Sequence, residues 1–228
     1  MGTREIPLFP LQAVLFPRMP MPLRIFEDRY RIMIERCIEH NAPFGVVLIR
    51  EGEESAEPAT PVSVGTLAQI HAVQKLEGGR VNILTVGSER FRVVERHADR
   101  EPYLIGVTEP YADDPPADVE RLSVLSGSVS GLFGEYFKAL ISAAGVDLPE
   151  YDLPSDAVDL SFVIAAVIQV PLEQRQTLLE MTDTAARLER EQAILQGQIE
   201  VIRRTPPRKA VRVAPFNYRA LDEVVTNN

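Results

Sequence analysis

Cysteine and histidine are scarce in this chain of 228 residues. Cys37 is the single cysteine, so no disulfide can form within the chain. Together with the three histidines, His40, His71 and His97, it supplies too few ligands for a closed structural zinc site. His40 follows Cys37 by three residues, but this thiol falls on an apolar stripe and is better explained as a core group. The scarcity of cysteine fits a reducing compartment, and we expect a cytoplasmic protein.

The sequence also lacks an apolar run long enough to cross a membrane. The longest runs, at 44–49 and 162–168, fall far short of the roughly 18 residues that a span requires. Prolines interrupt the beginning of the chain, where an export signal would need an apolar core, at Pro7, Pro10, Pro17, Pro20 and Pro22. We therefore expect neither a membrane segment nor an export signal.

An excess of basic residues is missing as well. The 24 lysines and arginines are outnumbered by 33 aspartates and glutamates, which gives a net charge of −9. A protein that binds nucleic acid mainly through its phosphates needs a basic face. Nucleic acid is therefore a disfavoured partner, although basic residues can still gather locally.

Motifs that would support catalysis are absent too. The sequence has no GxxxxGK phosphate-binding loop and no glycine-rich dinucleotide fingerprint. Of the three lysines, Lys138 lies on a predicted helix without a serine in a strained turn nearby, which disfavours a Ser–Lys peptidase. The acidic residues between Asp147 and Asp159 lack the glycine and spacing of a calcium loop. We therefore expect no catalytic residue, no cofactor and no metal ligand.

The positions of the prolines divide the chain into a strand-rich part and a helical part. Twelve of the 18 prolines lie at or before Pro116. Runs rich in β-branched and aromatic residues predict strands at 44–50, 62–73, 80–86, 89–95 and 103–108. Two pairs, Gly78–Gly79 and Gly87–Ser88, stand at hairpin positions between these runs. This spacing predicts an antiparallel barrel or sandwich, and the acidic stretch 51–61 reads as a surface loop.

One helix, at about 27–40, interrupts the strands. Its apolar stripe has helical spacing and consists of Tyr30, Met33, Ile34, Cys37 and Ile38. Proline-free stretches then predict longer helices, because an interior proline costs a helix about 3 kcal/mol. The first runs from a cap at Asp114 to Gly145, the second begins at a Ser155 cap and ends at Ile168, and Pro171 opens a third.

The last helix carries a heptad seam, made by Ala185, Leu188, Gln192, Leu195, Ile199 and Ile202. We expect its partner to be the apolar face of the 122–141 helix, and a second copy of the chain is the alternative. Three glycines in that partner helix, Gly127, Gly131 and Gly134, are expected to allow close helix packing. The sequence thus predicts an α+β fold: a β-barrel-like subdomain at 1–115 with one helix, a helical bundle at 116–205 with a long last helix, and a basic C-terminal arm at 206–228.

Three sequence blocks resemble the N-terminal domain of Lon proteases. The first is IPLFPLQAVLFPRMPMPLRIFEDRY at 6–30, the second is GTLAQIHAVQKLEGGRVNILTVGSERFRV at 65–93, and the third is VPLEQRQTLLEMTDTAARLEREQAILQGQIEVI at 170–202. The blocks occur in the family's order and extend over about residues 4–204. The resemblance implies a barrel of the PUA class followed by a helical bundle, with the third block forming the helix that closes the domain.

The resemblance also implies a function. In Lon proteases this domain precedes an ATPase module and a Ser–Lys peptidase module and helps to engage polypeptide substrates. No residue of this sequence matches the catalytic dyad, so the hypothesis is a non-catalytic polypeptide-recognition module, an adaptor or chaperone-like protein in proteolysis. Its expected partners are unfolded or specific polypeptide clients, with a protease or chaperone, and its expected state is a monomer or weak homodimer.

Two other functions stay open at this stage. PUA-like barrels elsewhere bind RNA, and Arg90, Arg92, Arg96 and the arm could concentrate positive charge despite the acidic total. A small-molecule enzyme is the third hypothesis, and it would require a deep polar pocket with convergent titratable groups.

The candidate polypeptide-binding residues lie in two of the matching blocks: Phe26, Glu27, Arg29 and Tyr30 in the first, and Arg90 and Arg92 in the second. Structural roles compete with binding at each position. Phe26 and Tyr30 are expected in the core as anchors of the first helix, and Arg29 is expected to neutralise a nearby carboxylate. Strand alternation predicts that Phe91 points inward while Arg90 and Arg92 point outward.

Overall fold

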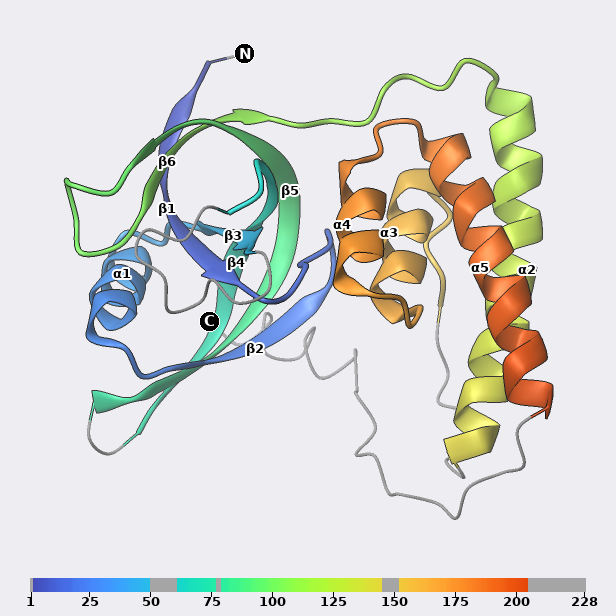
Figure 1. Cartoon of the computed structure of the whole chain (residues 1–228), viewed down its shortest axis with the longest axis horizontal. Helices are drawn as coiled ribbons and strands as arrows, with labels where there is room; N and C mark the ends of the chain where they lie inside the picture. Colours follow the sequence, from blue (N-terminus) through green and yellow to red (C-terminus); the bar gives the residue numbers. More distant parts are fainter. Residues whose placement is uncertain (1, 50–60, 77–78, 145–151, 205–228) are drawn as a thin grey trace. The chain divides into compact units, whose positions relative to one another are not determined.

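The computed structural model describes residues 2–49, 61–76, 79–144 and 152–204 (Figure 1). The predicted C-terminal arm and most of the predicted acidic loop lie outside these residues. Contacts divide the chain into two compact units, each described by itself below. The strand unit comprises residues 1–112 and 170–180, and the helical unit comprises 113–169 and 181–228. The division expected from the sequence counted 170–180 with the helical part, whereas the contacts of this segment are with the strands.

The strand unit is a six-stranded barrel-like sheet with two helices. Its strands are β1 (Arg4–Leu11), β2 (Pro20–Ile25), β3 (Phe44–Leu48), β4 (Val64–Lys75), β5 (Val81–His97) and β6 (Ile105–Pro110). Their order is β2-β5-β4-β3-β1-β6, and an additional β5–β6 pairing closes the sheet on itself (Figure 1). The predicted α+β fold with a barrel-like first part is confirmed. The pairing of β1 with β3 is parallel, so the barrel is not wholly antiparallel as predicted.

Strand β5 is continuous where the sequence predicted two strands joined by a turn at Gly87–Ser88. A Cβ atom on Gly87 would lie 2.1 Å from the carbonyl oxygen of Phe16. The backbone N–H of Gly87 donates to Met19 (2.9 Å), and its carbonyl accepts from the N–H of Arg18 (2.8 Å). Glycine at 87 therefore permits close approach of another backbone segment rather than a turn. The second predicted hairpin is present, because β4 and β5 pair antiparallel around the turn that contains Gly79, whose φ is +73°.

Helix α1 (Asp28–Glu39) packs on the sheet with the apolar stripe that the sequence predicted. Tyr30, Met33, Ile34 and Cys37 are buried in one core cluster with residues of the sheet. Ile38 is 41% exposed, so its predicted place in the core is wrong; it lies one position beyond the buried stripe. Burial raises the pKa of the Cys37 thiol to about 11, as expected for a core group.

The helical unit contains α2 (Val119–Ala144), α3 (Ala157–Val167) and α5 (Thr184–Arg204), whereas α4 (Leu172–Glu180) belongs to the strand unit. Residues 181–183 separate α4 from α5, so the segment that resembles one closing helix forms two. The predicted caps are also displaced. Asp118, rather than Asp114, accepts from a backbone N–H of the first turn of α2 (2.9 Å to Arg121). Asp156, rather than Ser155, caps α3.

The predicted pairing of the last helix with the 122–141 helix is confirmed, because α2 and α5 lie side by side (Figure 1). Leu188, Leu195 and Ile199 of the heptad seam are buried. Polar contacts join successive turns of the two helices in the same direction: Arg121 with Glu189, Ser128 with Gln192 and Glu135 with Arg203. The two helices therefore run parallel.

Two of the three glycines of α2 do not have the packing role expected for them. A Cβ atom on Gly127 or Gly131 would meet no heavy atom within 4 Å, so both positions face open space. In the parts of the chain that the structure describes, no helix is both long and apolar enough to span a bilayer.

Candidate functional site

Three strand segments form an arm of the sheet with one open face. Residues 20–25 of β2 pair with 81–86 of β5, and these pair in turn with the second half of β4, up to Lys75 opposite Val81. On one face of this arm, Met21, Ile25, Val81 and Ile83 are buried in the core cluster that contains the stripe of α1. Because successive side chains of a strand alternate, the residues between them face the other way.

The other face, called the open face below, consists of exposed or half-buried residues. In register they are Pro20, Val86 and Gln69; Pro22, Leu84 and Ala72; and Arg24, Asn82 and Gln74. Arg80 and Leu76 lie at the next position, since Leu76 N–H donates to the Arg80 carbonyl (2.8 Å) directly beyond the Lys75–Val81 pair, and the exposed Phe26 follows the last residue of β2. Seven of these twelve residues are apolar, three are amides, two are arginine and none is acidic. Such a surface can bind apolar side chains.

Polar contacts on and beside the open face are short-range. Asn82 Nδ2 donates to Gln74 Oε1 (3.3 Å), which joins these two amides across neighbouring strands. Arg24 has no ion pair with any residue in the described ranges. Arg31 Nη1 of α1 donates to the Gly79 carbonyl (3.3 Å), which ties the helix to the turn at the end of the arm. The turn at the end of the arm is thus held by Arg31, and the guanidinium of Arg24 can pair with a carboxylate of a partner.

The two edges of the arm are poor sites for adding another strand. β2 is the edge of the sheet, and its Pro20 and Pro22 have no N–H to donate. On the other side, the β4 segment beyond Ala68 pairs only with β5 among the described residues, and a register shift between Ile70 and Ala72 leaves His71 as an extra residue. Prolines and bulges both blunt edge strands. Side chains of the open face, rather than strand edges, are therefore the available recognition groups.

Four of the predicted site residues meet where β2 joins α1. Phe26 is 65% exposed, so its expected place in the core is wrong. Ile25, the last residue of β2, takes the core position, and the strand ends before Phe26. Tyr30 is in the core as expected, with its ring centroid 4.2 Å from that of Phe9. Arg29 Nε lies 2.9 Å from Glu27 Oε2, so this arginine does neutralise a carboxylate.

The other two predicted residues, Arg90 and Arg92, lie elsewhere on β5, where it pairs with β6. Nine residues separate Arg90 from Val81, about 30 Å along the strand at roughly 3.3 Å per residue. The ring of Tyr111 lies near both guanidinium groups, 5.0 Å from that of Arg90 and 4.5 Å from that of Arg92. The structure therefore does not bring the six predicted residues together into one site.

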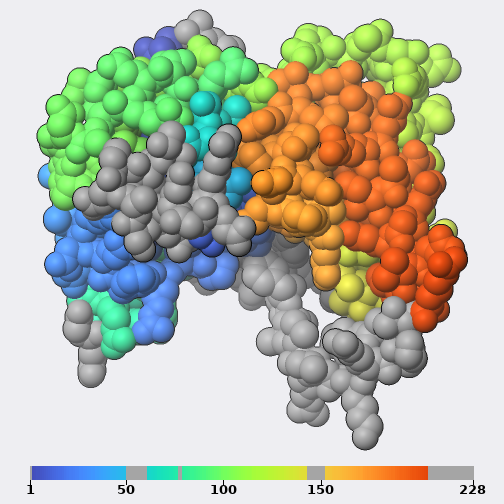
Figure 2. Space-filling view, in the orientation of Figure 1, coloured from blue at the N-terminus to red at the C-terminus, as the bar shows by residue number. Residues whose placement is uncertain are grey.

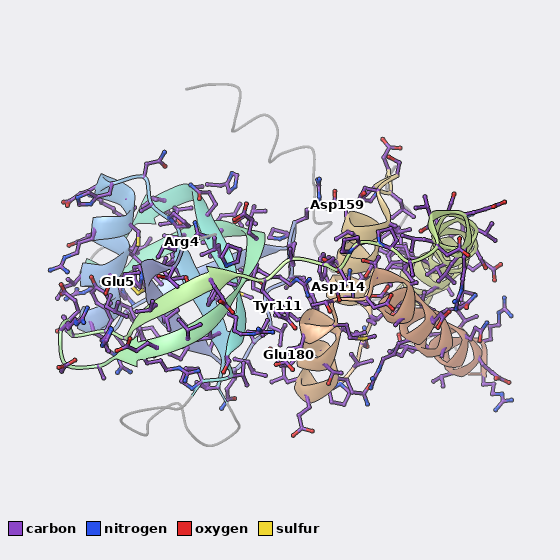
Figure 3. The ribbon with its side chains drawn as sticks, turned by 90° about the horizontal axis from the view of Figure 1, so that it is seen from above. Arg4, Glu5, Tyr111, Asp114, Asp159 and Glu180 are labelled. Carbon is purple, nitrogen blue, oxygen red and sulfur yellow. The ribbon has the colours of Figure 1, made fainter. Side chains whose placement is uncertain are left out.

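Arg90 holds α4 against the sheet. Its side chain lies on the outer face of β5, as predicted, but it is only 4% exposed, and its Nη1 donates to the Leu179 carbonyl (2.6 Å). Tyr111 lies beside Glu180 and donates its hydroxyl to the Glu180 carbonyl (2.7 Å; Figure 3). These bonds satisfy carbonyls in the last turn of α4 that the helix itself leaves unpaired. Sequence alternation could not indicate that another helix covers this outer face.

The helical unit contains a buried charged cluster that the sequence analysis missed. Arg187 is fully buried, and its guanidinium donates to Asp113 Oδ1 (2.7 Å), the Met181 carbonyl (2.7 Å) and Ser161 Oγ (2.5 Å). Ser161 donates in turn to Glu191 (3.2 Å), where α3 and α5 pack side by side (Figure 2). Burial raises the pKa of Glu191 well above its ordinary value, and the opposing effects of Arg187 and Ser161 are smaller. Each of the five groups hydrogen-bonds to another member of the cluster, and Glu191 Oε2 has no hydrogen-bond partner among the described residues. The bonds join α3, the start of α5 and Asp113, so we assign the cluster a structural role.

Two grooves lie between α2 and α5. One, of about 390 Å³, includes Leu132 and Ile199, and the other, of about 400 Å³, includes Val124 and Leu125. The charged residues that line each groove are of both signs. Within the described ranges, no group of three or more His, Cys, Asp or Glu side chains could hold a metal ion. Neither groove has the convergent titratable groups that a small-molecule enzyme would need.

Comparison with known proteins identifies relatives of the chain. Residues 5–197 match the family model described as the ATP-dependent protease La (LON) substrate-binding domain. A Lon protease of Xanthomonas oryzae pv. oryzae is 31% identical over 210 residues, which are 86% of this chain and 23% of that protein. A Lon protease of Escherichia coli K12 is 28% identical over 202 residues, 87% of this chain and 25% of that protein. The chain thus spans about a quarter of the length of these relatives.

Solved structures show the same similarity. A Lon N-terminal domain protein from Xanthomonas campestris is 27% identical, with a TM-score of 0.58 over 83% of this chain and 98% of that one. The N-terminal domain of a Mycobacterium avium complex Lon protease superposes with a TM-score of 0.64 over 85% of this chain and 98% of that one. That second domain is 17% identical, so it shows the fold alone.

Proposed function

Because the chain belongs to the family of LON substrate-binding domains, we propose that it is a non-catalytic module that recognises polypeptides through the open face of the arm. An unfolded polypeptide differs from a folded protein in offering apolar side chains to its surroundings. A protein that recognises such side chains must therefore expose apolar groups of its own, and polar groups among them must keep it from aggregating. The open face meets this requirement because its apolar residues are interspersed with arginine and amide side chains.

The exposure of Phe26 is the observation that carries the proposal. A phenylalanine that is 65% exposed retains most of its apolar surface for a partner. Burying such a side chain is worth about 1.5–3 kcal/mol, which is roughly tenfold or more in affinity. Its neighbours Glu27 and Arg29 neutralise each other at 2.9 Å, and Tyr30 anchors the adjoining helix. The four residues at the β2–α1 junction would thus act as one exposed anchor on a rigid support.

A role in proteolysis, as an adaptor or a chaperone-like protein that delivers clients, is the finer form of the proposal. It is supported by the family and by the protease relatives. The alternative of RNA binding loses support from the arginines on which it depended. Arg90 is buried under α4, Arg92 pairs with Glu109 at 3.5 Å, and Arg96 donates to the carbonyls of Pro61 and Val62. These cations are engaged with groups of the chain itself.

Substitution of the exposed anchor tests the proposal. Fluorescein-labelled casein serves as the unfolded polypeptide, and fluorescence anisotropy measures its binding to the full chain. Phe26→Ser should weaken binding by roughly tenfold, because the apolar surface of Phe26 is lost. Val94→Ser is the matched control, since Val94 is 51% exposed on β5 outside the arm, and it should bind casein as the parent does. Equal binding by the parent and Phe26→Ser, or no binding by the parent, would refute the proposed surface.

A further inference from the structure

We propose that the open face selects polypeptide segments in which carboxylates flank apolar side chains. This inference rests on the proposed function and specifies its substrate class. The charge of the open face differs in sign from the net charge of the whole chain. The chain as a whole has nine more acidic than basic residues, yet the described residues of the open face include two arginines, Arg24 and Arg80, and no carboxylate. An acidic chain thus presents a positively charged apolar surface.

Arg24 is placed to bind a carboxylate of the client that lies next to an apolar side chain of the client. Arg24 follows Pro22, which lies beside Leu84 and Ala72, by two residues on β2, and it precedes the exposed Phe26 by two residues in the chain. Residues two apart on a strand are separated by about 6.5–7 Å, and neighbouring strands by about 4.8 Å. A client side chain that lies on Phe26 or Leu84 would therefore place the next residues within reach of the guanidinium. The residues in register with Arg24 on the neighbouring strands are Asn82 and Gln74, whose amide side chains carry no charge.

The two carboxylates that follow Phe26 in the chain do not cancel the positive charge of Arg24. Glu27 and Asp28 both lie at the start of α1, directly after Phe26. Glu27 is paired with Arg29 at 2.9 Å, and Asp28 with Arg31 at 2.5 Å. Each acid is thus matched by its own arginine on the helix. Arg24 has no ionic partner within the described residues, so a client carboxylate would not have to displace one.

Three synthetic peptides of equal length test the inference. All share one apolar core that contains phenylalanine and leucine, and their flanking residues are glutamate, glutamine or lysine. The parent should bind the glutamate peptide roughly fivefold more tightly than the lysine peptide at low ionic strength, with the glutamine peptide in between. Raising the salt to about 0.5 M should shrink the difference, because these charges are exposed to solvent.

Charge reversal on the protein completes the test. Arg24→Glu should abolish the preference for the glutamate peptide or reverse it. Arg190→Glu alters the net charge by the same amount on the exposed surface of α5, and it should leave the preference unchanged. Phe26→Ser should weaken the binding of all three peptides by the same factor, which separates the effect of the apolar anchor from that of the charge.

The outcomes distinguish this inference from the proposed function. If the parent binds casein and all three peptides equally, or prefers the lysine peptide, the charge selection is refuted while polypeptide recognition stands. A loss of preference in Arg190→Glu as large as in Arg24→Glu would also refute it, because net charge rather than the open face would then decide. If neither casein nor any peptide binds, the proposed function itself fails.

Discussion

Arg187 and Asp113 form an ion pair of 2.7 Å in which the arginine side chain is fully buried. Asp113 opens the helical unit, and Arg187 lies in the first turns of α5, so the pair joins segments that are 74 residues apart. The Arg187 guanidinium also lies 4.2 Å from the ring centroid of Phe162 on α3. One charged side chain thus connects three parts of the unit.

Removing this arginine should be costly. Arg187→Leu removes the ion pair of the largely buried Asp113 and also the donor to Ser161, so we expect a loss of about 3–5 kcal/mol in the free energy of unfolding. Arg121→Leu is the control, because its ion pair with Glu189 is exposed and should contribute about 0–1 kcal/mol. Urea denaturation followed by circular dichroism measures both. Similar losses in the two variants would contradict the structural role of the buried pair.

The stability of the helical unit should fall as pH rises, in part because of Glu191. Its pKa in the folded chain is raised well above the ordinary 4.5 by burial, so the folded state holds a proton that the unfolded state releases. The stabilisation is full below pH 4.5 and is lost as pH rises through the folded-state value. Glu191→Gln keeps a neutral side chain at every pH. We expect its stability relative to the parent to increase between pH 5 and pH 9 in urea titrations, and a constant difference would contradict this assignment.

The docking of α4 on the sheet should depend on Leu179. This side chain is buried, and its carbonyl accepts from Arg90. Leu179→Ala should reduce the free energy of unfolding by about 2–5 kcal/mol, because it leaves a cavity at the contact. Leu172→Ala truncates the same type of side chain in the same helix where it is 39% exposed, and its cost should be under about 1 kcal/mol. Thermal unfolding of the two variants provides the comparison, and equal melting temperatures would show that α4 does not pack as described.

Two glycine substitutions should have opposite effects. Gly87→Ala would place a Cβ atom 2.1 Å from the Phe16 carbonyl oxygen, which is backbone and cannot move aside cheaply. We expect a loss of at least about 2 kcal/mol or a failure to fold. Gly127→Ala, by contrast, adds a methyl group in open space on α2 and should stabilise the chain by up to about 1 kcal/mol. Denaturant midpoints test both, and a destabilised Gly127→Ala would mean that this face of α2 is covered.

Much of the fold was predictable because it depends on local periodicity. The stripe from Tyr30 to Cys37 and the seam through Leu188 and Leu195 repeat at helical spacing, and both are buried where the pattern predicted. The antiparallel pairing around Gly79 follows from turn chemistry between two β-rich runs. Such signals lie within one element, or in two that are adjacent in the chain. Their boundaries were less certain, as the displaced caps at Asp118 and Asp156 show.

The sequence by itself thus determined the class of fold, the positions of most strands and helices, and the pairing of α2 with α5. Only the tertiary structure decided that Phe26 is exposed, that Arg90 lies beneath α4 and that Arg187 and Glu191 are buried. It also decided that Gly87 accommodates the backbone of Phe16. Each of these outcomes depends on a segment distant in the chain that either covers a side chain or leaves it open. Periodicity within one element specifies which side chains share a face, but it does not specify what packs against that face.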